Sequence, residues 1–224
     1  MEKVRIKDLV KFRRKTERSK KTFANNLKSW QKQKNDKSSG DYWISCLSTI
    51  SNVFKFNNKA LLKEKIDLLS SKIEATNDKR VKNRFQRNLD IVASFEDFDF
   101  EELKPEAELK FQNKPRKESI LDIKDFPLQA KPDHVFTFSI NGSDEIGAIW
   151  FIAQIGGFDK VELGMFADII YRYLEKNYSK DYFVNSTYCT AVDVFKGQKV
   201  CYKDIENGKI PVVIEQTIDE IKRI

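Results

Sequence analysis

The residues of this chain best suited to catalysis are carboxylates in its carboxy-terminal half. Two or three carboxylates that hold a divalent metal ion beside a lysine form the site of a metal-dependent nuclease, in which the metal ion activates water and the lysine neutralises developing charge. Lys199 could supply that cation, because it lies across a predicted hairpin from Asp193. The candidate ligands are Asp144, Glu145, Asp159, Glu162, Asp168 and Asp193.

The spacing of these acids argues against a nuclease. The expected strand acid followed by an acid-x-lysine triplet is missing, because residues 200–203 contain no acid. Asp144 and Glu145 suit a turn, and Asp159 with Glu162 suits the start of a helix. The sequence therefore predicts no metal ion, and a nuclease is the third of three hypotheses.

Other catalytic signals are weaker still. Gly156 and Gly157 lie between a predicted strand and a predicted helix, but neither a G-x-G-x-x-G motif nor a Walker lysine accompanies them, so we expect them to allow a turn. His134 lies at a strand start, and no serine or cysteine can be assigned to it as a nucleophile. The sequence favours a protein that is not an enzyme and has no cofactor.

Positive charge is concentrated at the amino-terminal end. The net charge is +7, from 41 Lys and Arg against 34 Asp and Glu. Residues 1–37 hold fourteen of these cations and four of the acids, a surplus of +10, so the remaining residues carry −3. A basic end on a mildly acidic body is typical of a protein that contacts a polyanion or an acidic protein surface.

Two segments place cations at helical spacing. A helix over residues 6–30 carries a cationic stripe opposite a thin apolar face, and a helix of a later bundle carries arginines at i, i+4 and i+7. Both stripes could line one surface if the first helix packs beside the bundle; a solvated helix face without a partner is the plain alternative. The predicted nucleic-acid contacts are Lys7, Lys11, Arg13, Arg14, Lys15, Arg18, Lys20, Lys21, Arg80, Arg84 and Arg87.

The longest apolar run, residues 145–157, predicts a buried central strand. Read with period two, it is apolar on both faces, so we expect Trp150 in the core and a cover on each side, the second supplied by the helical half or by a partner. The strand before it ends at Asn141-Gly142, which indicates a hairpin. The element order of strand, strand, helix, strand, strand, helix predicts an antiparallel sheet in a two-layer α+β sandwich.

The whole chain is predicted to have an α+β fold. We expect a basic helix and linker over residues 1–40, a helical bundle over 41–111, a proline-containing linker over 112–132 and an α+β sandwich over 133–224. Three helical patterns joined by short loops indicate the bundle. The sandwich is expected to fold by itself as a fragment of residues 127–224.

Composition favours a cytoplasmic protein without membrane contact. The three cysteines are an odd number without close-paired spacing, the amino terminus lacks an apolar signal segment, and no apolar run is long enough to span a bilayer. We therefore predict a nucleic-acid-binding or assembly component that contacts DNA or RNA through its helices and self-associates or docks a partner through its sandwich. The alternative is an accessory subunit whose basic helix grips an acidic partner protein.

Overall fold

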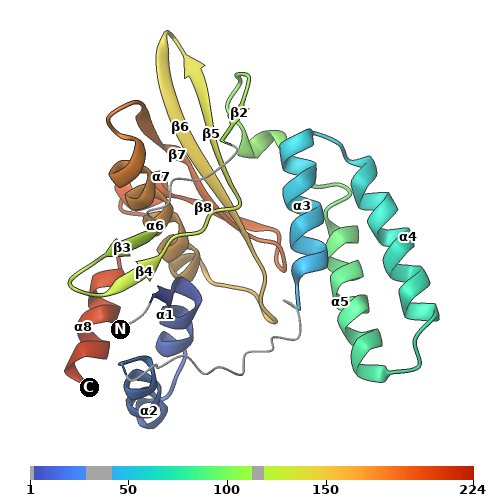
Figure 1. Ribbon diagram of the computed structural model, residues 1–224, viewed down its shortest axis with the longest axis horizontal. Helices are drawn as coiled ribbons and strands as arrows, with labels where there is room; N and C mark the ends of the chain where they lie inside the picture. Colours follow the sequence, from blue (N-terminus) through green and yellow to red (C-terminus); the bar gives the residue numbers. More distant parts are fainter. Residues whose placement is uncertain (1–2, 29–41, 113–118) are drawn as a thin grey trace.

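The computed structural model describes residues 3–28, 42–112 and 119–224 of the chain. Within these ranges, a five-stranded mixed sheet lies between two groups of helices (Figure 1). The strand order is β2-β5-β6-β7-β8. The strands are β2 (Lys110–Phe111), β5 (His134–Ile140), β6 (Ser143–Ile152), β7 (Phe183–Asp193) and β8 (Gln198–Cys201).

The predicted α+β class is confirmed, but the sheet is not antiparallel. The β5–β6 hairpin forms as predicted, with Asn141 and Gly142 at φ of 51° and 80°. Strands β6 and β7, however, run parallel, because helix α6 (Lys160–Tyr178) carries the chain back along the sheet between them. The two hairpins are therefore joined side by side through a parallel pair.

Helices cover both faces of the sheet, which makes three layers rather than two. Along β6, Ala148 and Ile152 join the hydrophobic cluster of α6, whereas Ile149 and Phe151 join that of the bundle. This alternation is the period of two that the sequence predicted. The first cover consists of α6, α1 (Ile6–Arg13) and α8 (Ile214–Arg223); the second consists of α3 (Ile44–Phe56), α4 (Ala60–Glu74) and α5 (Lys79–Ser94).

The bundle is built as the sequence indicated. Asp78 accepts hydrogen bonds from the first backbone N–H groups of α5 and so caps that helix. Helix α3 lies between the sheet and the α4–α5 pair (Figure 1). After α5, Phe95, Phe100 and Leu103 of the acidic-aromatic segment are buried in the same cluster as the bundle, with a short 3-10 helix at Glu101–Leu103. Its phenylalanines therefore complete the core.

The amino-terminal segment forms two helices rather than one. Helix α1 ends at Arg13, and α2 (Glu17–Lys28) begins after Thr16, whose carbonyl accepts from two backbone N–H groups of α2. Helix α1 is rich in core residues, because Ile6, Leu9 and Phe12 are fully buried. The end of the predicted helix, the connector over residues 31–40 and the predicted helix start at residue 41 lie outside the described residues.

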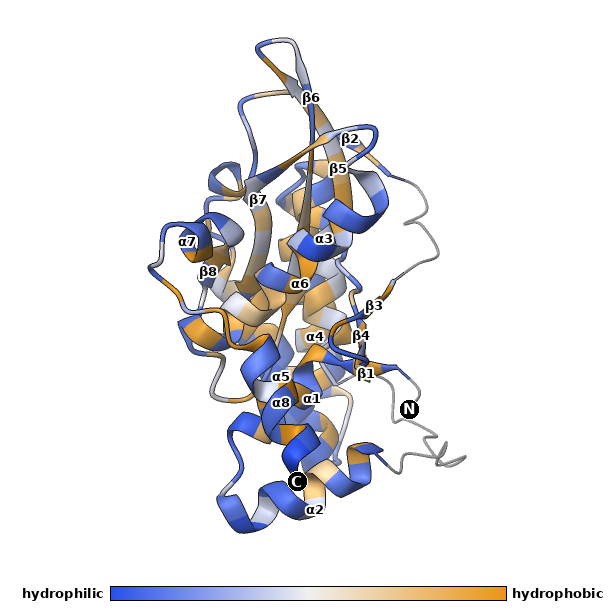
Figure 2. Cartoon of the chain, turned by 90° about the vertical axis from the view of Figure 1, so that its left-hand side faces the viewer, coloured by the Kyte–Doolittle hydropathy of each residue, from blue (hydrophilic) through white to orange (hydrophobic). Residues whose placement is uncertain are grey.

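A second, three-stranded sheet ties the amino terminus to the carboxy-terminal half. Strand β1 (Val4–Arg5) pairs in parallel with β4 (Pro127–Gln129), which pairs with β3 (Ile120–Asp122). The chain closes with α7 (Tyr202–Glu206) and α8. In Figure 2 the central strands and α6 are largely hydrophobic, whereas α2 is largely hydrophilic. None of the helices within the described ranges is both long and apolar enough to cross a membrane.

We expect residues 127–224 alone not to fold cooperatively, the reverse of what the sequence suggested. Removing the bundle would expose Phe136, Phe138 and Phe151, each of which is at most 3% exposed. Burial of such a side chain contributes about 1.5–3 kcal/mol. Thermal unfolding followed by circular dichroism, with dye binding to exposed apolar surface, checks this against the complete chain. A sharp melt of the fragment would contradict the shared core.

Candidate nucleic-acid interface

Four of the predicted cations on α1 and α2 are held by groups of the same protein. Each donates a hydrogen bond or forms an ion pair; the contacts of Lys7, Arg13 and Lys20 reach other elements, whereas that of Lys11 lies within α1. The contacts are Lys7 with the carbonyl oxygen of Ala153 (3.5 Å), Lys11 with Asp8 (3.7 Å), Arg13 with Thr217 (3.1 Å), and Lys20 with Glu17 (2.8 Å) and Glu220 (2.6 Å). Much of the amino-terminal positive charge therefore already has partners within the protein.

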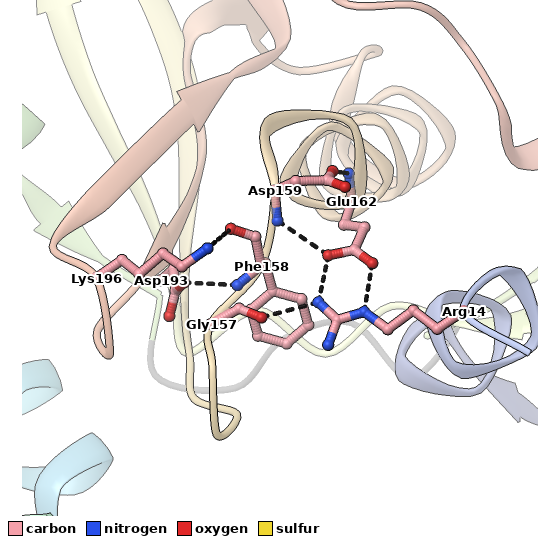
Figure 3. A network of polar contacts seen from close by, with 7 residues as sticks. All are labelled: Arg14, Gly157, Phe158, Asp159, Glu162, Asp193 and Lys196. Atoms are coloured by element: carbon pink, nitrogen blue, oxygen red, sulfur yellow. Dashed lines mark hydrogen bonds and ion pairs between the residues drawn. The ribbon is translucent and has the colours of Figure 1, made fainter.

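Arg14 forms a two-pronged ion pair with Glu162 (Figure 3). Its Nε and Nη2 donate to the two carboxylate oxygens at 2.5 Å each, and Nη2 also donates to the carbonyl oxygen of Gly157 at 2.8 Å. The side chain of Glu162 is 7% exposed and that of Arg14 38%. Burial acts to raise the pKa of Glu162, but hydrogen bonds from Arg14 and the backbone outweigh it and leave this pKa below its usual value. Arg14 thus joins α1 to the start of α6.

Asp193, at the end of β7, also holds the connection between β6 and α6 that Arg14 contacts. Its carboxylate accepts from the backbone N–H of Phe158 at 2.7 Å and of Phe195 at 2.9 Å, and the residue is fully buried. Burial raises the pKa of Asp193, and the backbone hydrogen bonds oppose that rise. Gly157 has a φ of 67°, and a Cβ there would lie 2.4 Å from a carboxylate oxygen of Asp193. The glycine is required both by the turn and by this close approach.

The six carboxylates of the nuclease hypothesis do not meet at one site, although Asp159, Glu162 and Asp193 share the polar network of Figure 3. Asp144 and Glu145 lie near the β5–β6 turn and bind Ser139 and Asn185. At the opposite end of β6, Asp159 and Glu162 form the capping box of α6, as their spacing indicated. The remaining candidates also have partners: Asp168 pairs with Arg172, Asp193 accepts from backbone, and Lys199 pairs with Glu102. The described ranges contain no cluster of three or more His, Cys, Asp or Glu suited to a metal ion.

One polar pair escaped sequence reasoning. The hydroxyl of Ser51 in α3 lies 2.7 Å from Nε2 of His134, which opens β5. The same nitrogen lies 3.0 Å from the backbone carbonyl oxygen of Ser51, which can only accept, so the tautomer with its proton on Nε2 satisfies both contacts. The pair ties the bundle to the sheet. The 83-residue separation gives it no signal in the sequence.

The arginines of α5, like Lys15, Arg18 and Lys21, form no ion pair with a described residue. Arg80 and Arg87 are exposed and Arg84 is half-buried. Arg87 donates to the hydroxyl of Tyr42 at 3.1 Å, and Arg84 lies 5.2 Å from the ring of Phe85. Asn88, 1% exposed, fixes this part of α5 to the start of α3 by bonding the backbone of Cys46 and Tyr42.

The two predicted cationic stripes do not form one surface. Helix α1 packs against α6 and α8 on one side of the sheet, whereas α5 belongs to the bundle on the other side (Figure 1). Lys15, Arg18 and Lys21 remain exposed on the amino-terminal side. The expectation that both stripes line one continuous surface is therefore wrong. The apolar residues of α1 cover the sheet and do not pack on the bundle.

Comparison of the chain with protein-family models, with curated proteins and with solved structures found no match.

Arg14→Ala is expected to lower the free energy of unfolding by about 1–3 kcal/mol, because it leaves the buried Glu162 without its charged donor. The lowered pKa of Glu162 contributes stability above its unfolded pKa of about 4.3, and that contribution is lost as pH falls through the folded value. Denaturant unfolding from pH 7 to pH 3 measures both effects. Arg18→Ala, an exposed neighbour, is the control and should cost under about 0.5 kcal/mol. Equal losses in the two variants would contradict the role of the ion pair.

Asp193→Ala is expected to cost about 2–4 kcal/mol, because the buried backbone N–H of Phe158 and the partly buried one of Phe195 lose their acceptor. Asp144→Ala, near the exposed hairpin turn, is the matched control and should cost little. Thermal melts of both variants with and without magnesium check this. Stabilisation by magnesium, or magnesium-dependent cleavage of DNA or RNA that Asp193→Ala abolishes, would return the nuclease hypothesis to first place.

Proposed function

We propose that this chain is a non-enzymatic nucleic-acid-binding protein whose main contact is the cationic face of α5. The observation that supports this most is the charge balance of that helix. It carries five cations and one carboxylate, Asp90, and none of the five forms an ion pair with a described residue. They are Lys79, Arg80, Lys82, Arg84 and Arg87. On α1 and α2, by contrast, carboxylates of the same chain pair with several of the cations.

The spacing of the three arginines suits a phosphate backbone. Arg80, Arg84 and Arg87 lie at i, i+4 and i+7, so they share one side of the helix and span about 10 Å along its axis. Duplex DNA carries about six phosphate charges over that length. Arginine also offers several N–H donors in a planar fork, which matches phosphate oxygens better than a lysine does.

The surroundings of the arginines support ordered contacts. Tyr42 accepts from Arg87 and packs edge-on against Trp43, with ring centroids 4.6 Å apart. Asn88 holds α5 against α3 one residue further along the helix. Side chains that are oriented before binding lose less entropy when a ligand binds. Lys15, Arg18 and Lys21 provide a second, separate cationic surface for a longer nucleic acid.

We expect the triple variant R80A/R84A/R87A to weaken binding to duplex DNA irrespective of sequence. If each arginine meets one phosphate, the slope of log affinity against log salt should become less steep by about 2.7, from roughly 0.9 counterions released per contact. Fluorescence anisotropy with labelled duplexes at several salt concentrations measures the slope, and labelled single-stranded RNA tests the other polyanion. Thermal melting should be nearly unchanged, because the arginines have no ion pairs with described residues.

The variant K15A/R18A/K21A is the matched control, with the same loss of charge on the other surface. It should change the slope by less than the α5 variant does. The reverse order would move the main contact to α2. Failure of the native chain to bind either DNA or RNA better than non-specific micromolar affinity would overturn the proposal in favour of an accessory subunit that grips an acidic protein.

A further inference from the structure

The central sheet has a notch at the end of β6. Strand β5 begins at His134, which pairs with Ile149, whereas β6 continues to Ile152. On the other side β7 stays paired with β6 as far as Asp193. The last three residues of β6 therefore lack a β5 partner, and the chain before β5 turns away toward β4. This notch is part of a cleft of about 490 Å³ between the start of α1, the β4–β5 connection and α3.

Trp150 lines this cleft and is not the core residue that the sequence predicted. Between Ile146 and Ile152 every residue of β6 is buried except Trp150, which is half-buried. Its ring packs edge-on against Phe166, with centroids 5.4 Å apart. Its indole N–H has no hydrogen-bond partner among the described residues. The central strand β6 thus presents the ring and the N–H of Trp150 to solvent, because β5 begins opposite Ile149 and does not reach Trp150.

Asp133 stands opposite this opening. Its Oδ2 accepts from the backbone N–H of Phe151 at 2.7 Å, which replaces the missing ladder bond, while Oδ1 has no partner within the described ranges. The residue is open to the cleft, but the surrounding protein desolvates its carboxyl group and raises the pKa of Asp133 to about 6. At pH 7.5 the group is therefore mainly ionised and can accept a hydrogen bond from a ligand.

Positive charge flanks this carboxylate. Lys7 and Lys131 both line the cleft and act through their charge to lower the pKa of Asp133. Arg5, also in the lining, is paired with Asp8 at 3.0 Å. The apolar surface that the cleft offers comes from Trp150 and Leu47, which are half-buried, because Ile6, Phe151 and Phe166 behind them are at most 2% exposed. A cleft of this size that combines an aromatic ring with a few convergent polar groups has the form of a small-molecule site.

We propose that this cleft binds a purine nucleotide. The ligand that fits the cleft has a flat ring with an N–H donor, joined to an anionic group. In this arrangement the ring lies against Trp150, its N–H groups donate to Asp133, and the phosphate meets Lys7 and Lys131. The proposal does not depend on nucleic-acid binding by α5, which lies on the other side of the sheet.

Isothermal titration of the complete chain with guanosine monophosphate at pH 7.5, together with tryptophan fluorescence, tests this proposal. We expect saturable binding with a change in tryptophan emission that Trp150→Phe removes. Guanosine, which lacks the phosphate, and ribose 5-phosphate, which lacks the base, should each bind at least about tenfold more weakly, because each makes only part of the contacts.

Asp133→Asn is the decisive variant, because its amide oxygen can still accept from Phe151 while the charge is lost. It should weaken nucleotide binding at least about tenfold, the size of a lost charge-assisted hydrogen bond, with an unchanged melting temperature. R80A/R84A/R87A is the control and should bind the nucleotide as the native chain does. Absence of saturable binding up to about 1 mM, or equal binding by Asp133→Asn, would overturn the proposal.

Discussion

The whole structure depends on the need to cover β6 on both faces. Its side chains are apolar on each side, so one layer of helices cannot bury them. Helices from both the amino-terminal and the carboxy-terminal half of the chain supply the two covers. The amino-terminal helix α1 joins α6 and α8 on one face, and the bundle covers the other. Each hydrophobic cluster therefore crosses the domain boundaries that composition indicated, and the polar contacts at the junctions fix how these covers meet the sheet.

Charge does two different tasks in this protein. On α1 and α2 the cations that have partners act as connectors, of which Arg14 with Glu162 is the most enclosed. On α5 the cations have no carboxylate partners among the described residues, and the helix is positioned by the neutral side chain of Asn88. Local charge surplus alone does not distinguish these tasks, because a buried carboxylate that pairs with an arginine can lie far away in the sequence.

The local features of the fold were accessible from the sequence. The two apolar faces of β6, the Asn141-Gly142 turn, the Asp78 cap and the Asp159–Glu162 helix start all follow from nearest-neighbour chemistry, and the structure contains each of them. The parallel β6–β7 pair was not accessible, since strand direction depends on the path of α6. The partner of Arg14 lies 148 residues away. The exposure of Trp150 depends on where β5 starts relative to the end of β6, which composition and period do not specify.

The uneven anchoring of α5 has a consequence for its motion. Its buried residues, Asn88, Ile91 and Val92, all lie in the second half of the helix, and the first nine residues, 79–87, contain none. The amino-terminal half packs on α4 through half-buried side chains such as Phe85 and not through fully buried ones. Backbone amides there should exchange with deuterated solvent sooner than those beyond Asn88, since local opening requires little buried surface to be exposed. Arg80 and Arg84 thus lie on the part of α5 that should open first, whereas Arg87 is held next to Asn88 by its hydrogen bond to Tyr42.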